Sequence, residues 1–477
     1  MPTDEHSRYE RTPIPEEPAR DRAASFIEIR HPYLPADAVL EAQRCLQCAM
    51  PYCVQACPID QDARGYILRI AEGKFDEAAL VTLRENPLGT TLCKVCYHFC
   101  EDACIMHERG VPIAIRQLKR AAMELGKSDL CYVPAALREE RVAIVGAGPA
   151  GLMAAWELGL RGYRVTVFEQ QPYIGGQVGE IPKYHMDGYE IEVDAERFRN
   201  LPVTFVMGKR IGTDVTIESL RAEGYSAIYL AVGTSDHKRL GIPGESLPEV
   251  YGAIDLLKEV NKGPAVSVGA RIVVIGGGDV AMDAVRSALR LQPHKDVTVV
   301  YRRTRDKMPA GHEESDEAEE EGVRFLYELS PVEILGTEHV EGIVVRKTKL
   351  SAPGPSGRPS VVPVPGSEET IPCDMVIVAV GEAPALAAFP AALDLRFGAQ
   401  GWPEGKNPDS MTGIEGIFAS GGKSVVHAMA AGTRSANGID AYLSRKAGRP
   451  PTPRPDPFGK GDPPALPRGY GAPTWTP

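Results

Sequence analysis

The chain contains two copies of a strand–glycine turn–helix–strand unit, a pattern that few folds accommodate. The first copy reads RVAIVGAGPAGLMAAWELGLRGYRVTVFEQ and begins at Arg141. An apolar strand enters a glycine turn, an alanine-rich helix follows, and a second strand ends at Glu169. Such a turn brings backbone N–H groups to a diphosphate, and the acid accepts hydrogen bonds from a ribose. The unit predicts a dinucleotide-binding domain. The alternative is a Rossmann-like core that binds no ligand.

Candidate dinucleotide contacts in this domain are small residues at the ends of strands. Gly146 permits the tight turn, Gly148 the close approach of a diphosphate, and Gly151 the packing of helix on strand. A Gly-Gly-Gln turn follows the acid, and the later strand AIYLAVGT also ends in glycine. The candidates are Gly146, Gly148, Pro149, Ala150, Gly151, Glu169, Gly176, Gln177, Gly233 and, from a still later strand, Gly421.

The second unit, RIVVIGGGDVAMDAVRSALRL, differs from the first at the end of its second strand. Ala281 replaces the third glycine, and Tyr301 stands where the acid stood. Two arginines follow at once, and arginine in this place pairs with a 2′-phosphate, which favours NADPH over NADH. The alternative is that both are solvated charges at a strand end. The candidates here are Gly276, Gly278, Asp279, Val280, Arg302 and Arg303.

Two dinucleotide sites on one chain predict a flavin and its hydride donor. Two strands after the second unit, CDMVIVAVGEAP with Gly381 and GIEGIFASGG with Gly421, are expected to return to the first domain. We therefore expect an FAD domain over 139–250 and 373–446, interrupted by an NAD(P)H domain over 251–372. The predicted fold class is α/β, with two nested Rossmann-like domains behind a mainly helical domain over 1–138.

Eight of the ten cysteines form two dense runs in that helical region, each with intervals of two to four residues. They are Cys45, Cys48, Cys53, Cys57, Cys93, Cys96, Cys100 and Cys104. Ferredoxin runs have this spacing and end in Cys-Pro, whereas zinc sites usually show two close pairs and disulfides are rare in reducing compartments. The pattern favours two four-iron clusters over zinc or disulfides, and we interpret Cys131 and Cys373 as ordinary thiols.

Composition excludes several other classes of protein. The formal net charge of −11 argues against nucleic-acid binding. No apolar run is long enough to span a membrane, and the polar start MPTDEHSRYERTP does not resemble a signal peptide, so we expect a cytoplasmic protein. We interpret the acidic run HEESDEAEEEG as a solvated helix face. The proline-rich tail over 447–477 is expected to be extended.

Together these motifs resemble the small subunit of glutamate synthase and its relatives, which include the N-terminal half of dihydropyrimidine dehydrogenase. The resemblance rests on CLQCAMPYCVQACP, CKVCYHFCEDAC, VAIVGAGPAGL, GGQVGEIPKYHM, GGGDVAMDAVRSA, VYRRTRDKMPA and GIFASGG. It implies two [4Fe-4S] clusters in the first domain, FAD at the first glycine turn and a nicotinamide nucleotide at the second. The family's YRR arginines occur with both NADPH and NADH, so the resemblance does not decide between them.

The resemblance also implies cluster ligands, and it shows where this chain departs from the family. One cluster would be held by Cys45, Cys48, Cys53 and Cys104, and part of the other by Cys57, Cys96 and Cys100. The fourth ligand of the second cluster is open between Cys93 and a nearby polar side chain such as Gln117. The late flavin motif usually ends Gly-Gly-Asp, whereas Lys423 stands here in place of the acid.

We therefore expect an oxidoreductase subunit that passes electrons between NAD(P)H, FAD and two clusters. Its partner would be a catalytic oxidoreductase subunit or a ferredoxin-type acceptor, docked on the N-terminal domain of a hetero-oligomer. No residue is assigned an acid–base role, because hydride transfer needs none. The alternatives are a zinc-bearing scaffold with a degenerate flavin site and a flavin disulfide reductase. The latter needs a cysteine pair beside its cofactors, yet no cysteine occurs between Cys131 and Cys373.

Overall fold

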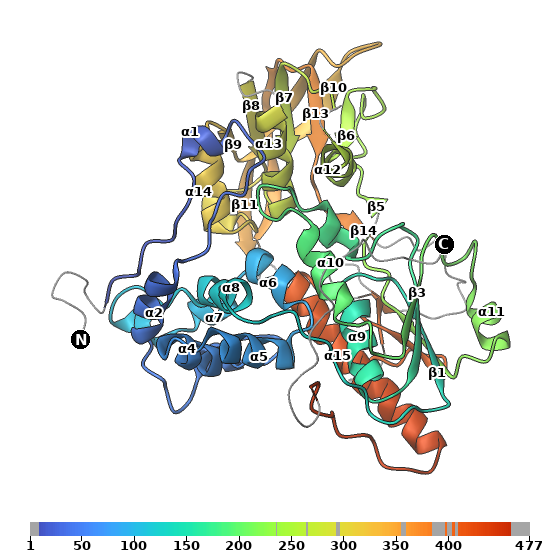
Figure 1. Ribbon diagram of the computed structural model, residues 1–477. Coiled ribbons are helices and arrows are strands. Elements are labelled where there is room, and N and C mark those ends of the chain that lie inside the picture. Colours follow the sequence, from blue (N-terminus) through green and yellow to red (C-terminus); the bar gives the residue numbers. More distant parts are fainter. Residues whose placement is uncertain are drawn as a thin grey trace.

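The computed structural model (Figure 1) has a helical N-terminal region, two parallel sheets and a smaller antiparallel sheet. The residues that the structure describes are 9–234, 236–263, 266–291, 296–353, 359–383, 396–397, 403–405 and 409–458. Among these residues, no helix combines the length and the apolar character that crossing a membrane requires.

The helical region consists of short amphipathic helices whose apolar faces meet in one core. Its elements are α1 (Ala19–Arg22), α2 (Pro35–Gln43), α3 (Tyr52–Gln55), α4 (Ala63–Ala71), α5 (Phe75–Glu85), α6 (Gly89–Val95), α7 (Phe99–Asp102) and α8 (Ile115–Leu125). In α8, Ile115, Leu118 and Ala122 recur at helical spacing and join this core, although polar residues of the helix such as Lys119 and Arg120 are buried as well. Because α3 and α7 each carry a cysteine, this core positions both cysteine runs.

The first sheet is a five-stranded parallel sheet in the order β17-β4-β1-β2-β3. Its strands are β1 (Arg141–Val145), β2 (Arg164–Phe168), β3 (Val203–Val206), β4 (Ala227–Leu230) and β17 (Ile417–Ala419). Helix α9 (Pro149–Leu160) begins with proline at its first position and is buried from Ala150 onward, because it lies between the sheet and α15 (Val425–Lys446). This is the expected first dinucleotide-type domain, and α10 (Tyr189–Glu196) and α11 (Ile217–Ala222) complete it.

The second sheet is also parallel, in the order β6-β13-β7-β8-β9. Its strands are β6 (Val250–Gly252), β7 (Arg271–Ile275), β8 (Asp296–Tyr301), β9 (Arg324–Tyr327) and β13 (Met375–Val378). We expected the strand of CDMVIVAVGEAP to return to the first domain, and that assignment was wrong. Met375–Val378 pairs with β7 on one side and β6 on the other. The second domain therefore begins at β6 or before it and continues past β13.

Helices α12 (Ala253–Lys262), α13 (Asp279–Leu291) and α14 (His312–Glu320) belong to the second domain. Between β9 and β13 the chain forms an antiparallel sheet of β10 (Leu329–Leu335), β11 (Gly342–Pro353) and β12 (Pro359–Ile371). The two connections between the domains pair with each other as β5 (Asp236–His237) and β14 (Glu382–Ala383). The second domain is thus an insertion whose entrance and exit lie side by side.

The described start of the tail is packed against the body of the protein. The guanidinium of Arg454 pairs with Glu85 of α5 and lies over the ring of Trp156. Phe458 is buried and stacks on Tyr132. These contacts fix the chain after α15, whereas Trp475 and the rest of the tail lie outside the described residues.

A candidate site between three domains

One cavity of about 780 Å³ lies between the two glycine turns. Residues of both parallel-sheet domains form its walls, and Val95 and Tyr97 of the helical domain reach it as well. Every candidate dinucleotide contact except Gly151 lines this cavity. These are Gly146, Gly148, Pro149, Ala150, Glu169, Gly176, Gln177, Gly233, Gly276, Gly278, Asp279, Val280, Arg302, Arg303, Gly381 and Gly421.

The first glycine turn has the geometry that the sequence predicts. Gly146 has φ +107°, and a Cβ there would lie 2.4 Å from the carbonyl oxygen of Ala231, which follows β4. A Cβ on Gly151 would lie 1.9 Å from the Gly146 oxygen, so this glycine packs helix on strand instead of lining the cavity. Beside Gly148 the nearest atom is 3.9 Å away, which leaves backbone open to a diphosphate.

Glu169 is buried at the cavity wall with its carboxylate held by backbone. One oxygen accepts from Ala147 N and the other from Gln171 N, both at 2.8 Å. A carboxylate oxygen has capacity for a further hydrogen bond, so the residue keeps an orientation that suits a ribose hydroxyl. The first turn and its acid therefore fit the adenosine half of a dinucleotide.

The second glycine turn repeats these relations with β13 in the place of β4. A Cβ on Gly276 would lie 2.3 Å from the oxygen of Ala379, which follows β13. A Cβ on Gly277 would meet the ring of Tyr301 at 2.5 Å. In each domain the residue after a strand that neighbours the glycine turn packs against that turn: Ala231 after β4 in the first domain, and Ala379 after β13 in the second. This packing requires Met375–Val378 to lie beside β7 in the second sheet.

The two arginines after β8 line the cavity on the side of the second turn. The Nε atom of Arg303 is buried without a hydrogen-bond partner among the described residues. By contrast, the guanidinium of Arg305, two residues on, pairs with Asp316 and Glu319 at the surface. An unpaired buried donor at this strand end suits an anionic group. Lys423 also lines the cavity, beside Gly421.

Seven of the eight clustered cysteines form two groups, within which the charge of one thiolate raises the pKa of its neighbours. Burial, then Cys45 and Cys104, raise the pKa of Cys53 to about 11, and Cys48 acts in the same direction. Burial raises the pKa of Cys100 well above its usual value, and Cys96 and Cys57 contribute. Burial therefore favours the protonated thiols, and a metal ion that binds them must displace these protons.

The packing of the cysteines follows these groups except at Cys100, which belongs to the second group but packs with the first. Cys57 and Cys96 pack against the core that includes β1, α9 and α15, and Phe99 joins them there. Cys45, Cys53, Cys100 and Cys104 pack against the core of the helical domain. In the described part of the chain no three Cys, His, Asp or Glu side chains form a compact site for a single metal ion.

Cys93 and Gln117 line one small cavity, together with the segment 28–30. The thiol of Cys93 donates to the carbonyl oxygen of Thr90 at 3.0 Å. Burial raises the pKa of Cys93 to about 12, and the charges that act on it come from Lys119, Arg120, Glu124 and Lys94. The amide nitrogen of Gln117 donates to the carbonyl oxygen of His31. Neither contact joins these residues to another cysteine.

Comparison with known proteins agrees with this division of the chain. Residues 22–129 match the family described as dihydropyrimidine dehydrogenase domain II, 4Fe-4S cluster, and residues 140–435 match pyridine nucleotide-disulphide oxidoreductases. The chain is 36% identical over 452 residues to the NADPH glutamate synthase small chain of Halomonas elongata, across 89% of this chain and 95% of that one. The chain belongs to the family of glutamate synthase small chains.

Two further comparisons set the limits of this likeness. The NADP⁺-dependent formate dehydrogenase subunit beta of Moorella thermoacetica is 34% identical over 427 residues, which are 82% of this chain and 60% of that subunit. FprA of Mycobacterium tuberculosis in complex with NADPH has a TM-score of 0.55 at 21% identity, over 66% of this chain and 87% of that one, and shows the fold alone.

Membership of the glutamate synthase small-chain family confirms the predicted class of protein and its cofactors. The protein is an electron-transferring oxidoreductase that uses FAD, a nicotinamide dinucleotide and [4Fe-4S] clusters. The fold class, helical region first and nested α/β domains after it, is confirmed as well. The zinc scaffold is replaced by the iron–sulfur assignment. Cys131 and Cys373 are both buried, so neither offers the exposed thiol that a disulfide reductase needs.

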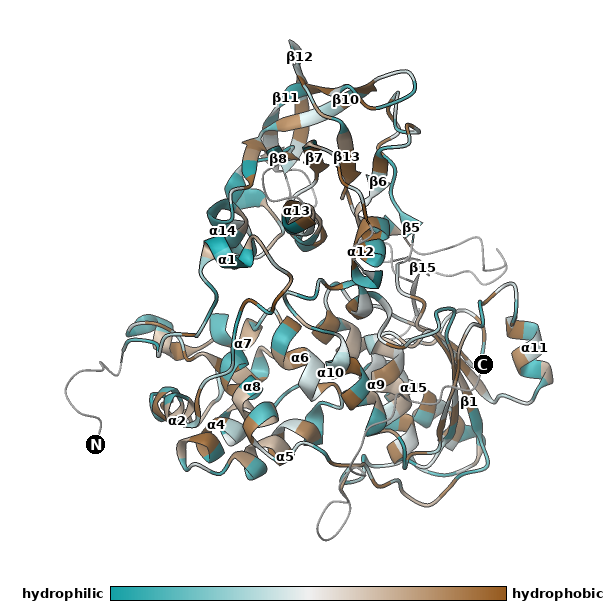
Figure 2. Ribbon diagram, turned by 45° about the horizontal axis from the view of Figure 1, so that its top comes forward, coloured by the Kyte–Doolittle hydropathy of each residue, from teal (hydrophilic) through white to brown (hydrophobic). Residues whose placement is uncertain are grey.

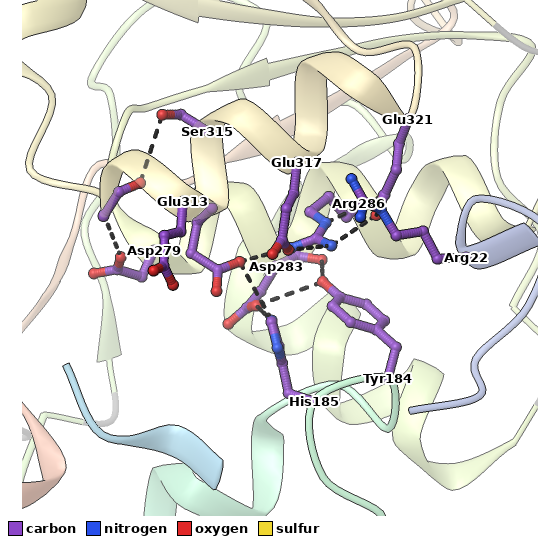
Figure 3. Close-up of polar contacts among 12 residues, drawn as sticks. Arg22, Tyr184, His185, Asp279, Asp283, Arg286, Glu313, Ser315, Glu317 and Glu321 are labelled. Atoms are coloured by element: carbon purple, nitrogen blue, oxygen red, sulfur yellow. Dashed lines mark hydrogen bonds and ion pairs between the residues drawn. The ribbon is translucent and has the colours of Figure 1, made fainter. Parts of the chain in front are cut away.

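The acidic run HEESDEAEEEG, which we interpreted as a solvated helix face, is instead half buried. Figure 2 shows α14 as strongly hydrophilic, yet its inner acids meet a fully buried arginine of α13. The guanidinium of Arg286 lies 2.6 Å from Glu314, 2.8 Å from Glu317 and 2.6 Å from Glu321. Figure 3 shows this network reaching Tyr184 and His185 of the first domain. The spacing of the acids along the sequence does not indicate this buried ion network.

A second residue that sequence reasoning missed is Glu180, at the cavity wall. One carboxylate oxygen lies 3.6 Å from Lys258 Nζ of α12, and the other is buried without a hydrogen-bond partner among described residues. Burial raises the pKa of Glu180 to about 7, and Lys258 opposes that shift. This ion pair joins the first domain to the second beside the cavity between the glycine turns.

Proposed function

We propose that electrons move between a nicotinamide nucleotide at the second glycine turn, FAD at the first, and two clusters in the helical domain. The observation that carries this proposal is the single cavity lined by both turns and by Tyr97, which directly follows Cys96. The cofactors supply hydride and single-electron chemistry, and the protein supplies placement. Glu169 would orient the FAD ribose, and Arg303 with Arg302 would pair with the 2′-phosphate of NADPH.

The two cysteine groups suggest an order for the clusters. Cys57, Cys96 and Cys100 would hold the cluster nearer to FAD, because Cys96 packs against the first domain's core and its neighbours line the cavity. Gln117 would supply the fourth ligand, because the charges that act most on the Cys93 thiol come from Lys119, Arg120, Glu124 and Lys94 and not from another cysteine. The remaining four cysteines, Cys45, Cys48, Cys53 and Cys104, would hold the outer cluster. Thiolate ligands need a reducing compartment, so we propose a cytoplasmic location.

The outer cluster would face the partner protein. Met50 and Tyr52, between Cys48 and Cys53, are 58% and 45% exposed, which leaves two large apolar side chains at the surface beside the outer cysteine group. Such residues mark interaction sites when they gather at one place. The partner would be a catalytic oxidoreductase subunit or a ferredoxin-type acceptor in a hetero-oligomer, and the large subunit of a glutamate synthase is one candidate.

Anaerobically prepared protein with FAD and iron should reduce one-electron dyes with NADPH but make no glutamate alone. The double variant Met50→Ser with Tyr52→Ser should keep its iron and lose coupled turnover with the native partner, because apolar docking contacts are removed. Leu137→Ser, which changes a residue 64% exposed elsewhere, is the control. Full coupled turnover in the double variant would refute the docking face. Protein that binds neither iron nor flavin would refute the electron relay itself.

A further inference from the structure

The loop over 96–99 is bound to the nucleotide domain as well as to the first domain. The hydroxyl of Tyr97 donates to Oδ2 of Asp279 at 2.5 Å. Arg116 donates to the carbonyl oxygen of Cys96 at 3.1 Å, and its other nitrogen lies 3.4 Å from a carboxylate oxygen of Glu313. His98 also lies 3.7 Å from Glu313. Three neighbouring side chains thus tie one cysteine loop to the second domain.

Asp279 stands at the point where these ties meet the nucleotide site. It is the first residue of α13, directly after the glycine turn, and it lines the cavity. Its second oxygen accepts from Gly311 N at 3.1 Å, in the loop before α14. One carboxylate therefore joins the helix start, that loop and the cysteine loop.

A bound dinucleotide would place a diphosphate at the start of α13, where glycine turns of this kind hold it. Charges that are shielded from water interact strongly, so the ligand must affect the Asp279 carboxylate and the groups that donate to it. Tyr97 is such a donor and is covalently joined to Cys96. Any effect of the ligand on the cysteine group requires an equal effect of the cysteine group on the ligand's affinity.

We propose that Tyr97 is a positioning residue that couples occupancy of the second glycine turn to the cysteine group that contains Cys96. The coupling rests on the proposed function, because it assumes a nicotinamide dinucleotide at Gly276–Gly278 and a cluster on Cys96. Reduction of that cluster adds negative charge to the loop that Tyr97 anchors. Binding of an anionic nucleotide therefore weakens when the cluster is reduced.

The test uses 2′-phospho-ADP-ribose, which carries the diphosphate but has no nicotinamide to be reduced. Its dissociation constant is measured with the loaded protein oxidised and then reduced by dithionite, and the clusters' paramagnetic resonance spectra are recorded with and without it. Tyr163→Phe is the matched control, because the Tyr163 hydroxyl donates to the buried Asp440 at 2.7 Å away from the cavity. We expect the loss of affinity on reduction to be at least about fivefold greater in wild type and Tyr163→Phe than in Tyr97→Phe.

Equal losses of affinity in Tyr97→Phe and Tyr163→Phe, with spectra equally sensitive to the ligand, would overturn the coupling. If Tyr97→Phe fails to load iron, Asp279→Asn provides the second arm, because it keeps the tyrosine and removes the charge. If reduction weakens ligand binding as much in Asp279→Asn as in Tyr163→Phe, the coupling is also overturned. A smaller loss of affinity in Asp279→Asn would support the coupling. Wild-type protein without iron or flavin would refute the proposed function, whereas loaded but uncoupled protein refutes this inference alone.

Discussion

The guanidinium carbon of Arg286 lies 5.0 Å from the ring centroid of Tyr184, although the two residues come from different dinucleotide-type domains. Arg290 lies over the same ring at 3.9 Å. The tyrosine hydroxyl in turn donates to the carbonyl oxygen of Asp283 at 3.3 Å. One aromatic ring of the first domain is therefore held by two arginines of the second, which are themselves neutralised by the acids around α14.

Replacing Arg286 by methionine should be strongly destabilising. Three acids would lose a fully buried cation, and breaking a buried ion network in this way costs about 3–5 kcal/mol. Arg305→Met is the matched control, since Arg305 also pairs with acids of α14 but at the surface, where such pairs contribute about 0.2–1 kcal/mol. Urea denaturation followed by circular dichroism measures both. Similar losses in the two variants would show that the inner acids of α14 are not held by Arg286.

Cys93 and Cys96 should behave differently although they are three residues apart. Cys93→Ala should retain about eight irons, because its thiol already donates to a backbone carbonyl inside the core. Cys96→Ala should lose about four. Iron and acid-labile sulfide are determined on anaerobically prepared protein. A loss of iron in Cys93→Ala equal to that in Cys96→Ala would make Cys93 the fourth ligand and exclude Gln117.

Arg302→Ala combined with Arg303→Ala should raise the Michaelis constant for NADPH by about tenfold to a hundredfold. The lost contact is a charge-assisted hydrogen bond to the 2′-phosphate, which NADH lacks, so the constant for NADH should change little. Arg305→Ala is the control, because that guanidinium is occupied by Asp316 and Glu319. Wild-type protein that prefers NADH under the same conditions would contradict the assignment.

Glu180 should make stability fall as the pH rises through neutrality. Its folded pKa of about 7 lies above the unfolded value of about 4.3. Between these values the folded protein keeps a proton that the unfolded chain has released, so the contribution is complete below the lower value and is lost as the pH passes the higher.

Glu180→Gln has no such proton to lose. Its stability relative to wild type should therefore increase by about 1–2 kcal/mol between pH 6 and pH 8, as measured by urea denaturation of the flavin-loaded protein. Glu338→Gln, which removes an exposed carboxyl away from the cavity, is the control. A Glu180→Gln profile parallel to that of wild type would show that this carboxyl does not titrate near pH 7.

The sequence predicted correctly the features that depend on neighbouring residues. The two wrong predictions, the sheet of Met375–Val378 and the solvation of α14, depend on residues distant in sequence. The glycine turns, the acid at Glu169 and the cysteine runs can each be recognised from a pattern of a few neighbouring residues. The strand Met375–Val378 and the strand Ala227–Leu230 are both apolar and both lead into glycine, so nothing in either shows which sheet edge it joins. From the sequence, the acids of α14 have no visible partners, because Arg22 and Arg30, with which they form ion pairs, lie almost three hundred positions earlier.

The paired connections β5 and β14 have a consequence for how the protein can change over evolutionary time. His237 and Glu382 lie opposite each other in one short ribbon, so everything between them leaves the first domain and returns at a single point. A segment exchanged at this point would also have to keep the contacts across the domain boundary, such as those of Arg286 and Arg290 with the ring of Tyr184. The fold therefore allows the second domain to be exchanged as a unit only where the replacement keeps these contacts and the hydrogen bond between Tyr97 and Asp279.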